Sequence, residues 1–164
     1  MLRIIGCVMI VFAGSMLGFL KSDGLFRRAK LLGRIITGLN LLKTDIGYGK
    51  KDLRTALLGI GKNHDIELFS KTAEKMSEKG VKEALNNALA VYSEPLKEGD
   101  KEPIFALSEN LGMTDVASQV SAIETAIVSL DSALKEAEED YRRLGKMYRS
   151  VGVLGGLLVA IIFI

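Results

Sequence analysis

The sequence has little cysteine, histidine or proline: one Cys, one His and two Pro among 164 residues. The single cysteine, Cys7, cannot form an intrachain disulfide, which excludes a disulfide-stabilised fold and fits a reducing compartment. One cysteine and one histidine, His64, are too few for a Cys/His zinc site. Both prolines lie within residues 93–103, so the rest of the chain is free of this helix breaker.

The sequence also lacks a strong excess of one charge and any recognisable catalytic pattern. Its formal net charge is +2, whereas a nucleic-acid-binding domain is usually strongly basic. The segments that begin at Gly49 and Gly61 lack the Ser or Thr that follows lysine in a phosphate-binding loop. We therefore predict no catalytic residue, cofactor, metal site, nucleic-acid partner or small-molecule substrate. An alternative hypothesis is a membrane enzyme that uses His64 or Asp45.

Charged and apolar residues are segregated along the chain. The mean hydropathy is +0.24 although 26% of the residues are charged. Of the 42 charged residues, 41 lie within 21–150, because 1–20 contain only Arg3 and 151–164 contain none. This pattern predicts an N-terminal transmembrane anchor (1–21), a cytoplasmic helical bundle (22–150) and a C-terminal transmembrane anchor (151–164).

The two apolar runs differ in length. Residues 4–20 carry no charge and span about 26 Å as a helix, near the lower limit for crossing a bilayer. The run continues past Ala13-Gly14-Ser15, a poor cleavage site, so we expect an uncleaved anchor rather than a signal peptide. Residues 151–164 span only about 21 Å. Tyr148 and Arg149 precede them, where an aromatic belt residue and a snorkelling cation are typical of a membrane segment. The alternative is a core helix docked on the protein.

The basic residues beside the runs predict the orientation in the membrane. Cytoplasmic flanks are enriched in Lys and Arg, and both runs are basic on the side that faces the charged body. The residues on that side are Lys21, Arg27, Arg28, Lys30 and Arg34 for the first run, and Arg142, Arg143, Lys146 and Arg149 for the second. We therefore expect the body in the cytoplasm and both termini on the outer side.

Both runs also contain glycines at positions that let membrane helices approach closely. Small residues four apart permit close backbone contact in lipid, and this spacing is met by Gly14 with Gly18 and by Gly152 with Gly156. We predict membrane-helix packing at these glycines and at Gly155, either between the two anchors or with partner subunits. The alternative is that glycine is simply frequent in membrane helices.

The body is expected to be entirely helical, because no stretch alternates with a period of two. Gly80 is a plausible C-cap, and 93–103 have no apolar periodicity and are expected to be a loop. The periodicity predicts about six helices, at 25–46, 51–62, 66–78, 82–92, 103–111 and from about 115 onward.

The last helix has the most regular pattern. Its apolar positions alternate in steps of four and three, a 3.5-residue repeat typical of a helix–helix seam. Without proline it can run on into the C-terminal anchor, over about 75 Å. The stripe packs either within a bundle or against a second copy, as in a membrane-anchored coiled-coil signal relay. The predicted seam residues are Val120, Ile123, Ile127, Leu130, Leu134, Tyr141 and Leu144.

Several motifs together resemble the stage III sporulation protein AB family. They are Leu42-Lys-Thr-Asp-Ile-Gly-Tyr-Gly49, Leu53-x-x-Ala-Leu57, Leu111-Gly-x-x-Asp115 and the tail Tyr148-Arg-Ser-Val-Gly-Val-Leu-Gly-Gly-Leu157. The tail is the most specific, and the resemblance covers essentially the whole chain. Lys50-Lys51 departs from the Thr-Pro-type turn expected between the first two motifs.

The resemblance implies a fold and a set of partners. The family is similar to the cytoplasmic domain of the type II secretion F protein, which implies a six-helix cytoplasmic bundle. It also implies a non-enzymatic platform subunit in the channel that links mother cell and forespore during endospore formation. The implied partners are the membrane, a cytoplasmic secretion-type ATPase and other channel membrane subunits. Asp45 and Tyr48 lie within the first motif. From its place at the end of the first cytoplasmic helix, Asp45 is either a packed polar contact or a partner contact, and both residues are candidates for a partner contact.

Overall fold

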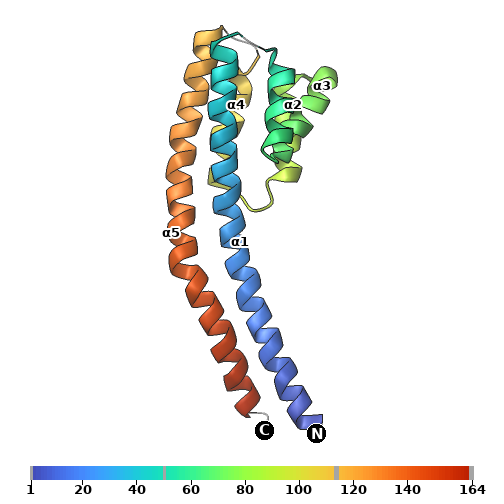
Figure 1. The fold of residues 1–164 in the computed structure, drawn as a ribbon, viewed down its shortest axis with the longest axis vertical. Helices are drawn as coiled ribbons and strands as arrows, with labels where there is room; N and C mark the ends of the chain where they lie inside the picture. The colour runs from blue at the N-terminus through green and yellow to red at the C-terminus, as the bar shows by residue number, and fades with distance from the viewer. Residues whose placement is uncertain (1, 50, 113–114, 163–164) are drawn as a thin grey trace. The chain divides into compact units, whose positions relative to one another are not determined.

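The computed structural model describes residues 2–49, 51–112 and 115–162 (Figure 1), and only the backbone of 2–5, 7, 8 and 162. The side chain of Cys7 and the last two residues of the expected C-terminal anchor lie outside this description. The described residues form five helices and no strand, which confirms the all-α prediction with a long apolar helix at each end. The helices are α1 (Leu2–Gly47), α2 (Leu53–Asn63), α3 (Glu67–Tyr92), α4 (Glu98–Asn110) and α5 (Val116–Ile162).

The chain divides into two compact units, and both α1 and α5 contribute to each. One unit combines Met1–Ala29 with Lys135–Ile164, and the other is Lys30–Leu134. We call them the helix pair and the bundle. In the helix pair, α1 and α5 run side by side in opposite directions (Figure 1). The bundle contains the remaining parts of these two helices together with α2, α3 and α4.

The bundle has an apolar core to which all five helices contribute. Each buried Leu or Ile side chain stabilises the fold by about 1.5–3 kcal/mol relative to an exposed one. The most completely buried large apolar residues are Leu32, Ile35, Leu39 and Leu42 of α1, Leu57 of α2, Ile66 just before α3, Leu68 and Leu89 of α3, Ile104 of α4, and Ile123 and Leu130 of α5.

Two glycines let the helices of the bundle pack closely. A Cβ atom at Gly38 of α1 would lie 2.5 Å from Cε2 of Phe69 and 2.8 Å from Cδ1 of Ile66. A Cβ atom at Gly61 of α2 would lie 2.5 Å from the backbone nitrogen of Ser70. Real Cβ atoms do not approach other heavy atoms so closely. A larger residue at Gly38 would therefore displace the Phe69 and Ile66 side chains, and one at Gly61 would have to move the backbone of α3.

The expected break at Gly80 is present, and the helix boundaries differ from the expectation in two places. The expected helices at 66–78 and 82–92 are the two parts of α3, separated at Gly80, whose φ of 77° and ψ of 165° are not helical. Helix α4 begins at Glu98 rather than near 103. The carboxylate of Asp100 accepts a hydrogen bond from the Lys97 N–H at 2.9 Å and starts the helix before Pro103. Helix α1 runs from the first apolar run into the expected helix at 25–46 without a break.

Candidate functional site

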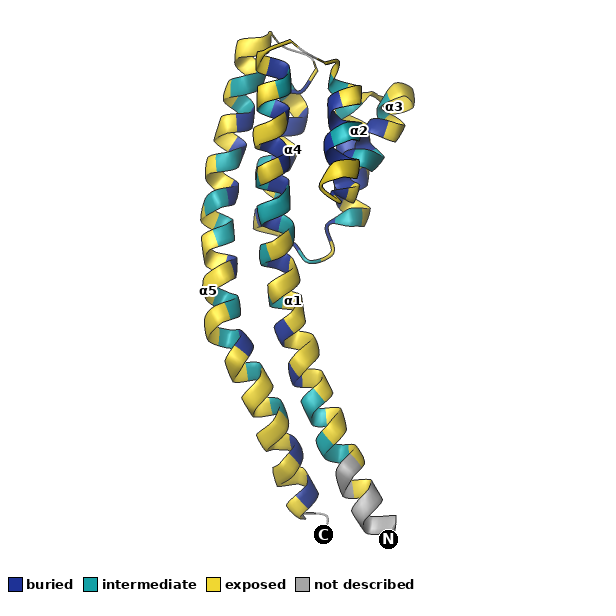
Figure 2. Cartoon of the chain, in the orientation of Figure 1, coloured by how far each residue is buried: buried dark blue, intermediate teal, exposed yellow. Residues whose placement is uncertain are grey.

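Helices α1 and α5 are long and apolar enough to cross a membrane. The qualifying stretches lie in Met9–Gly47 and Val116–Ile161. Only 11% of the residues in the most apolar stretch of α1 and 17% of those in the most apolar stretch of α5 are buried. A core helix, in contrast, buries its apolar face inside the protein. In Figure 2 the described parts of both helices in the helix pair are mostly exposed, and Phe12 and Ile161 are 70% and 71% exposed. Such exposed apolar surface indicates membrane association.

The glycines of the two apolar ends contact each other within one chain. A Cβ atom at Gly14 would lie 2.9 Å from the carbonyl oxygen of Gly152, and one at Gly152 would lie 2.7 Å from that of Gly14. A Cβ atom at Gly18 would meet the carbonyl oxygen of Tyr148, and one at Gly156 would lie 3.0 Å from the Cα of Val11. The two backbones are therefore in direct contact along this line.

Gly155 differs from these four glycines. A Cβ atom there would meet nothing within 4 Å, and the residue is exposed. It lies beside the contact between α1 and α5 rather than in it.

A polar cluster lies where the charge-free runs of the helix pair end. The Nε of Arg149 donates a hydrogen bond to the Oγ of Ser22 at 2.9 Å. Its guanidinium carbon is 5.5 Å from the centre of the Phe19 ring, within the range of a cation–π contact. The ring of Tyr141 is 5.3 Å from that of Phe26. Arg149 thus joins α5 to α1 with its charged group at the edge of the apolar stretch, as expected of a snorkelling arginine.

A buried arginine, Arg28, also joins the two helices. The side chain of Arg28 is only 4% exposed and lies 3.4 Å from Oε1 of Glu136 and 3.5 Å from Oδ2 of Asp140. A charged group is costly to bury unless it is paired. The two carboxylates of α5 therefore favour one register of α5 along α1.

Two of the predicted seam residues of α5 have neighbours in α1, and two others are fully buried. Ile123 and Leu130 are fully buried, and the Cγ2 of Val120 would lie 3.9 Å from a Cβ atom at Gly47. In the helix pair, Tyr141 contacts Phe26 of α1. Ile127, Leu134 and Leu144 are half-buried.

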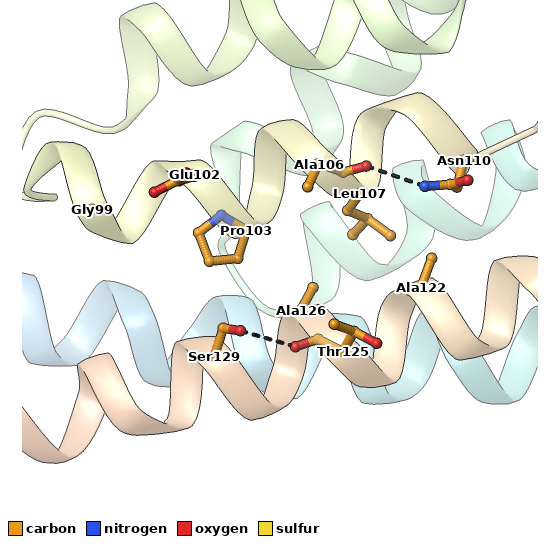
Figure 3. A pocket seen from close by; sticks show the side chains of 10 residues that line it. All are labelled: Gly99, Glu102, Pro103, Ala106, Leu107, Asn110, Ala122, Thr125, Ala126 and Ser129. Carbon is orange, nitrogen blue, oxygen red and sulfur yellow. Dashed lines mark hydrogen bonds between the residues drawn. The ribbon is translucent and has the colours of Figure 1, made fainter.

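A groove lies between α4 and α5 in the bundle (Figure 3). Its volume is about 560 Å³. Small side chains from both helices line it, among them Ala106, Ala122, Ala126 and Ser129, with Glu102 at the α4 side. The hydroxyl of Ser129 donates to the Thr125 carbonyl oxygen of its own helix, so this donor is already used within α5.

The two candidate partner-contact residues lie at one end of the bundle. Asp45 is half-buried and its Oδ2 is 3.2 Å from the Nζ of Lys51. Tyr48, in the turn after α1, is 74% exposed, and Val116 at the start of α5 is 50% exposed. Gly112, which follows α4, lies near Leu53 of α2. The residue after α4 therefore lies beside the start of α2, and the side chains of Tyr48 and Val116 are exposed.

The described residues hold no group of three His, Cys, Asp or Glu side chains that could bind a metal ion. His64 is exposed at the end of α2, where its N–H donates to the Ile60 carbonyl oxygen at 3.0 Å. Its backbone thus closes the last turn of the helix.

The shifted pKa values belong to surface capping and pairing groups. Hydrogen bonds from the side chain and N–H of Thr55 lower the pKa of Asp52, the N-cap of α2, below its ordinary 3.8. Hydrogen bonds from the hydroxyl and N–H of Ser118 likewise lower the pKa of Asp115, just before α5. A hydrogen bond from Lys82 lowers the pKa of Glu109. These groups stabilise helix ends and surfaces rather than forming a reactive cluster.

The family of the chain follows from comparison with known proteins. A family model for Stage III sporulation protein AB (spore_III_AB) matches residues 3–164. The chain belongs to this family. It is similar to Stage III sporulation protein AB of Bacillus subtilis (strain 168), with 29% identity over 170 residues that cover 99% of each protein. It is also similar to a solved structure of Stage III sporulation protein AB (SpoIIIAB), with 25% identity and a TM-score of 0.63.

That structural match covers 70% of this chain and 96% of the other. The matches confirm the resemblance inferred from the motifs and support a role in sporulation for this chain.

Sequence reasoning missed three residues of the helix pair: Ser22, Arg28 and Gly145. Ser22 and Gly145 are buried against each other, since a Cβ atom at Gly145 would lie 3.1 Å from the Ser22 Oγ. Gly145 stands four residues before Arg149, and this small residue within a charged stretch was the available signal. Arg28 looked like one of several flanking cations, and nothing in the sequence marked it as the buried one.

Proposed function

We propose that this chain is a non-enzymatic membrane platform subunit of the channel between mother cell and forespore. One observation carries the proposal: a charged bundle is inserted in sequence between two apolar helix ends that contact each other through glycines. Such a chain can hold a folded domain at a membrane surface and present it to a second protein. Membership of a sporulation family supports placing this role in spore formation.

The flanking charges support one orientation. Lys21 follows the first apolar run, and four basic residues of α5 precede the second without an acidic residue among 141–162. Basic flanks stay on the cytoplasmic side. The bundle then lies in the mother-cell cytoplasm, and both termini point outward from the mother-cell membrane that faces the forespore.

The bundle offers a docking end for a cytoplasmic partner. We place the secretion-type ATPase at the end that carries Tyr48 and Val116, with the Asp45–Lys51 ion pair beside it. Exposed aromatic and aliphatic side chains near ionic groups are typical of the centre and rim of a protein interface. Channel membrane subunits would contact the outer apolar faces of α1 and α5.

The docking proposal is tested by co-purification of the full-length chain from sporulating cells, with the captured ATPase identified by mass spectrometry. Tyr48→Ala should reduce its recovery at least about tenfold, because a central interface aromatic often contributes 2 kcal/mol or more. Val91→Ala is the matched control, since Val91 is a comparably exposed residue of the bundle (66%). Equal recovery with Tyr48→Ala and Val91→Ala would place the docking surface elsewhere, and no recovery with the unaltered chain would refute docking.

The non-enzymatic part of the proposal has its own test. His64→Ala should leave sporulation efficiency unchanged in cells that accumulate normal amounts of the protein, because His64 is exposed and lies outside the proposed docking end. Loss of sporulation by a stably folded His64→Ala variant would instead support a catalytic role.

A further inference from the structure

A second groove runs along the helix pair. It lies between α1 and α5 and has a volume of about 460 Å³. Leu17 of α1 and Val159 of α5 form part of its apolar wall, and Lys21 and Tyr148 line one end. Apart from the lysine ammonium and the tyrosine hydroxyl, its side chains are apolar. The groove therefore has one chemically distinct, polar end.

Gly155 keeps this groove open. Gly152 and Gly156 bring α5 against α1, whereas a Cβ atom at Gly155 would meet nothing within 4 Å. Gly155 nevertheless lines the groove. Its missing side chain thus leaves space beside the helix contact without being required by that contact.

The groove has the length of one lipid leaflet. Its lining extends from Lys21 to Ile10 on α1 and from Tyr148 to Val159 on α5, about 16 Å along each helix. Half of a bilayer's hydrocarbon core is about 15 Å. A membrane helix of a partner subunit would need an apolar track across the whole core, so this length favours an acyl chain.

The polar end of the groove is basic. Lys21 is exposed and is the first charged residue after the apolar run 4–20. On α5, the two turns before the second apolar run contain four basic residues: Arg142, Arg143, Lys146 and Arg149. No acidic residue lies within 141–162. Basic pockets between membrane helices on the cytoplasmic side attract anionic lipid headgroups.

We propose that this groove binds a phospholipid with an anionic headgroup. One acyl chain lies along the wall that contains Leu17, Gly155 and Val159. The phosphate lies at the polar end, where the Lys21 ammonium and the Tyr148 hydroxyl are hydrogen-bond donors. The bound lipid fills the space next to the helix contact and stabilises the pair. The proposal depends on membrane insertion and not on ATPase docking.

Native mass spectrometry of the full-length chain in detergent tests the proposal. The probes are phosphatidylglycerol, cardiolipin and phosphatidylcholine with identical acyl chains. The unaltered chain should retain the two anionic lipids preferentially. Lys21→Gln should weaken their retention about fivefold, the effect of one surface cation on an anionic lipid, and should hardly change that of phosphatidylcholine. Lys62→Gln, which removes the same charge from an exposed residue of the bundle outside the groove lining, is the control.

A second pair of variants tests the acyl-chain site. Gly155→Leu adds a side chain to the groove wall at a position where a Cβ atom meets nothing within 4 Å, and it should reduce retention of all three lipids. Val153→Leu, outside the groove lining, should not. Should Gly155→Leu fail to accumulate, Val159→Trp fills the groove from its other end. Unchanged lipid retention in the groove-filling variant would overturn the proposal. Loss of a co-purifying membrane subunit with unchanged lipid retention would assign the groove to a protein helix instead.

Discussion

Gly59 and Gly61 of α2 show how much a single position can decide. A Cβ atom at Gly61 would lie 2.5 Å from the nitrogen and 3.0 Å from the Cα of Ser70, both backbone atoms that cannot rotate away. At Gly59 a Cβ atom would meet nothing within 4 Å. One glycine is therefore required by packing, and the other only weakens the helix.

This difference predicts opposite effects of the same substitution. Gly61→Ala should lower the free energy of unfolding by about 1–3 kcal/mol, because the added methyl group overpacks the α2–α3 contact. Gly59→Ala should raise it by about 0.5–1 kcal/mol, because alanine favours the helix. Chemical denaturation of the purified chain in detergent measures both. Two shifts of the same sign would contradict the packing described for Ser70.

The buried Arg28 is a second case at this scale. It lies among basic residues that reach solvent, yet its side chain is 4% exposed and faces two carboxylates of α5. Breaking such a pair is more harmful than replacing it entirely by apolar groups, because a lone buried charge remains. A charge count along the chain cannot make this distinction.

At the scale of the element, the start of α2 depends on a carboxylate. The Oδ2 of Asp52 accepts a hydrogen bond from the Thr55 N–H at 3.1 Å, and the Thr55 interactions lower its pKa below 3.8. A depressed pKa means that the contribution to stability is complete above the ordinary pKa. It is lost as the pH falls through the folded-state value.

The cap therefore predicts a pH-dependent mutational effect. Asp52→Ala should lower the urea concentration at the unfolding midpoint at pH 7. The gap, which is the difference in this midpoint between the variant and the unaltered chain, should narrow as the pH falls below 3.8. Urea titrations at pH 7 and pH 3 measure the gap. Glu94→Ala removes an exposed carboxylate from a turn and should show no such narrowing. A gap of equal size at both pH values would mean that the charge on Asp52 is irrelevant.

The contact between α1 and α5 in the helix pair also belongs to this scale. A Cβ atom at Gly18 would collide with the carbonyl oxygen of Tyr148, whereas one at Gly24 of the same helix would meet nothing within 4 Å. Gly18→Ala should therefore separate the helices locally and lower the thermal unfolding midpoint in detergent. Gly24→Ala should leave it unchanged or raise it. A lowered midpoint for Gly24→Ala alone would contradict the described contact.

At the scale of the whole molecule, the question is whether the seam of α5 pairs within one chain or between two. Ser22 and Gly145 lie close enough that a Cβ atom at Gly145 is 3.1 Å from the Ser22 Oγ. Paired cysteines require Cβ atoms about 3.5–4.5 Å apart. In a Cys7→Ser background, Ser22→Cys with Gly145→Cys should form an intrachain disulfide under mild oxidation.

Non-reducing electrophoresis and mass spectrometry separate the outcomes. A fast-migrating monomer supports the intramolecular pair. A covalent dimer as the main product would favour the coiled-coil relay. Ser22→Cys combined with Lys146→Cys is the control, since Lys146 is exposed and Gly145 is buried; it should form little disulfide.

Several features of this molecule were determined by the sequence alone. The segregation of charge, the 3.5-residue periodicity and the scarcity of proline can all be read from neighbouring residues. They predict the helices and the apolar ends because the backbone preferences and hydration of nearby residues decide both. The same information located the break at Gly80, where only glycine easily adopts the observed backbone. It also identified the family, because motifs are read directly from residues.

The tertiary structure decided what each residue contacts. Residues far apart in sequence meet only through packing, so the pairing of Arg28 with Glu136, of Ser22 with Arg149 and of Gly14 with Gly152 has no local signature. The early start of α4 likewise depends on Asp100. The fold buries this residue, and its carboxylate accepts a hydrogen bond from the Lys97 N–H. Glycines that look equivalent in the tail differ for the same reason: Gly152 and Gly156 touch α1, and Gly155 lies open beside them.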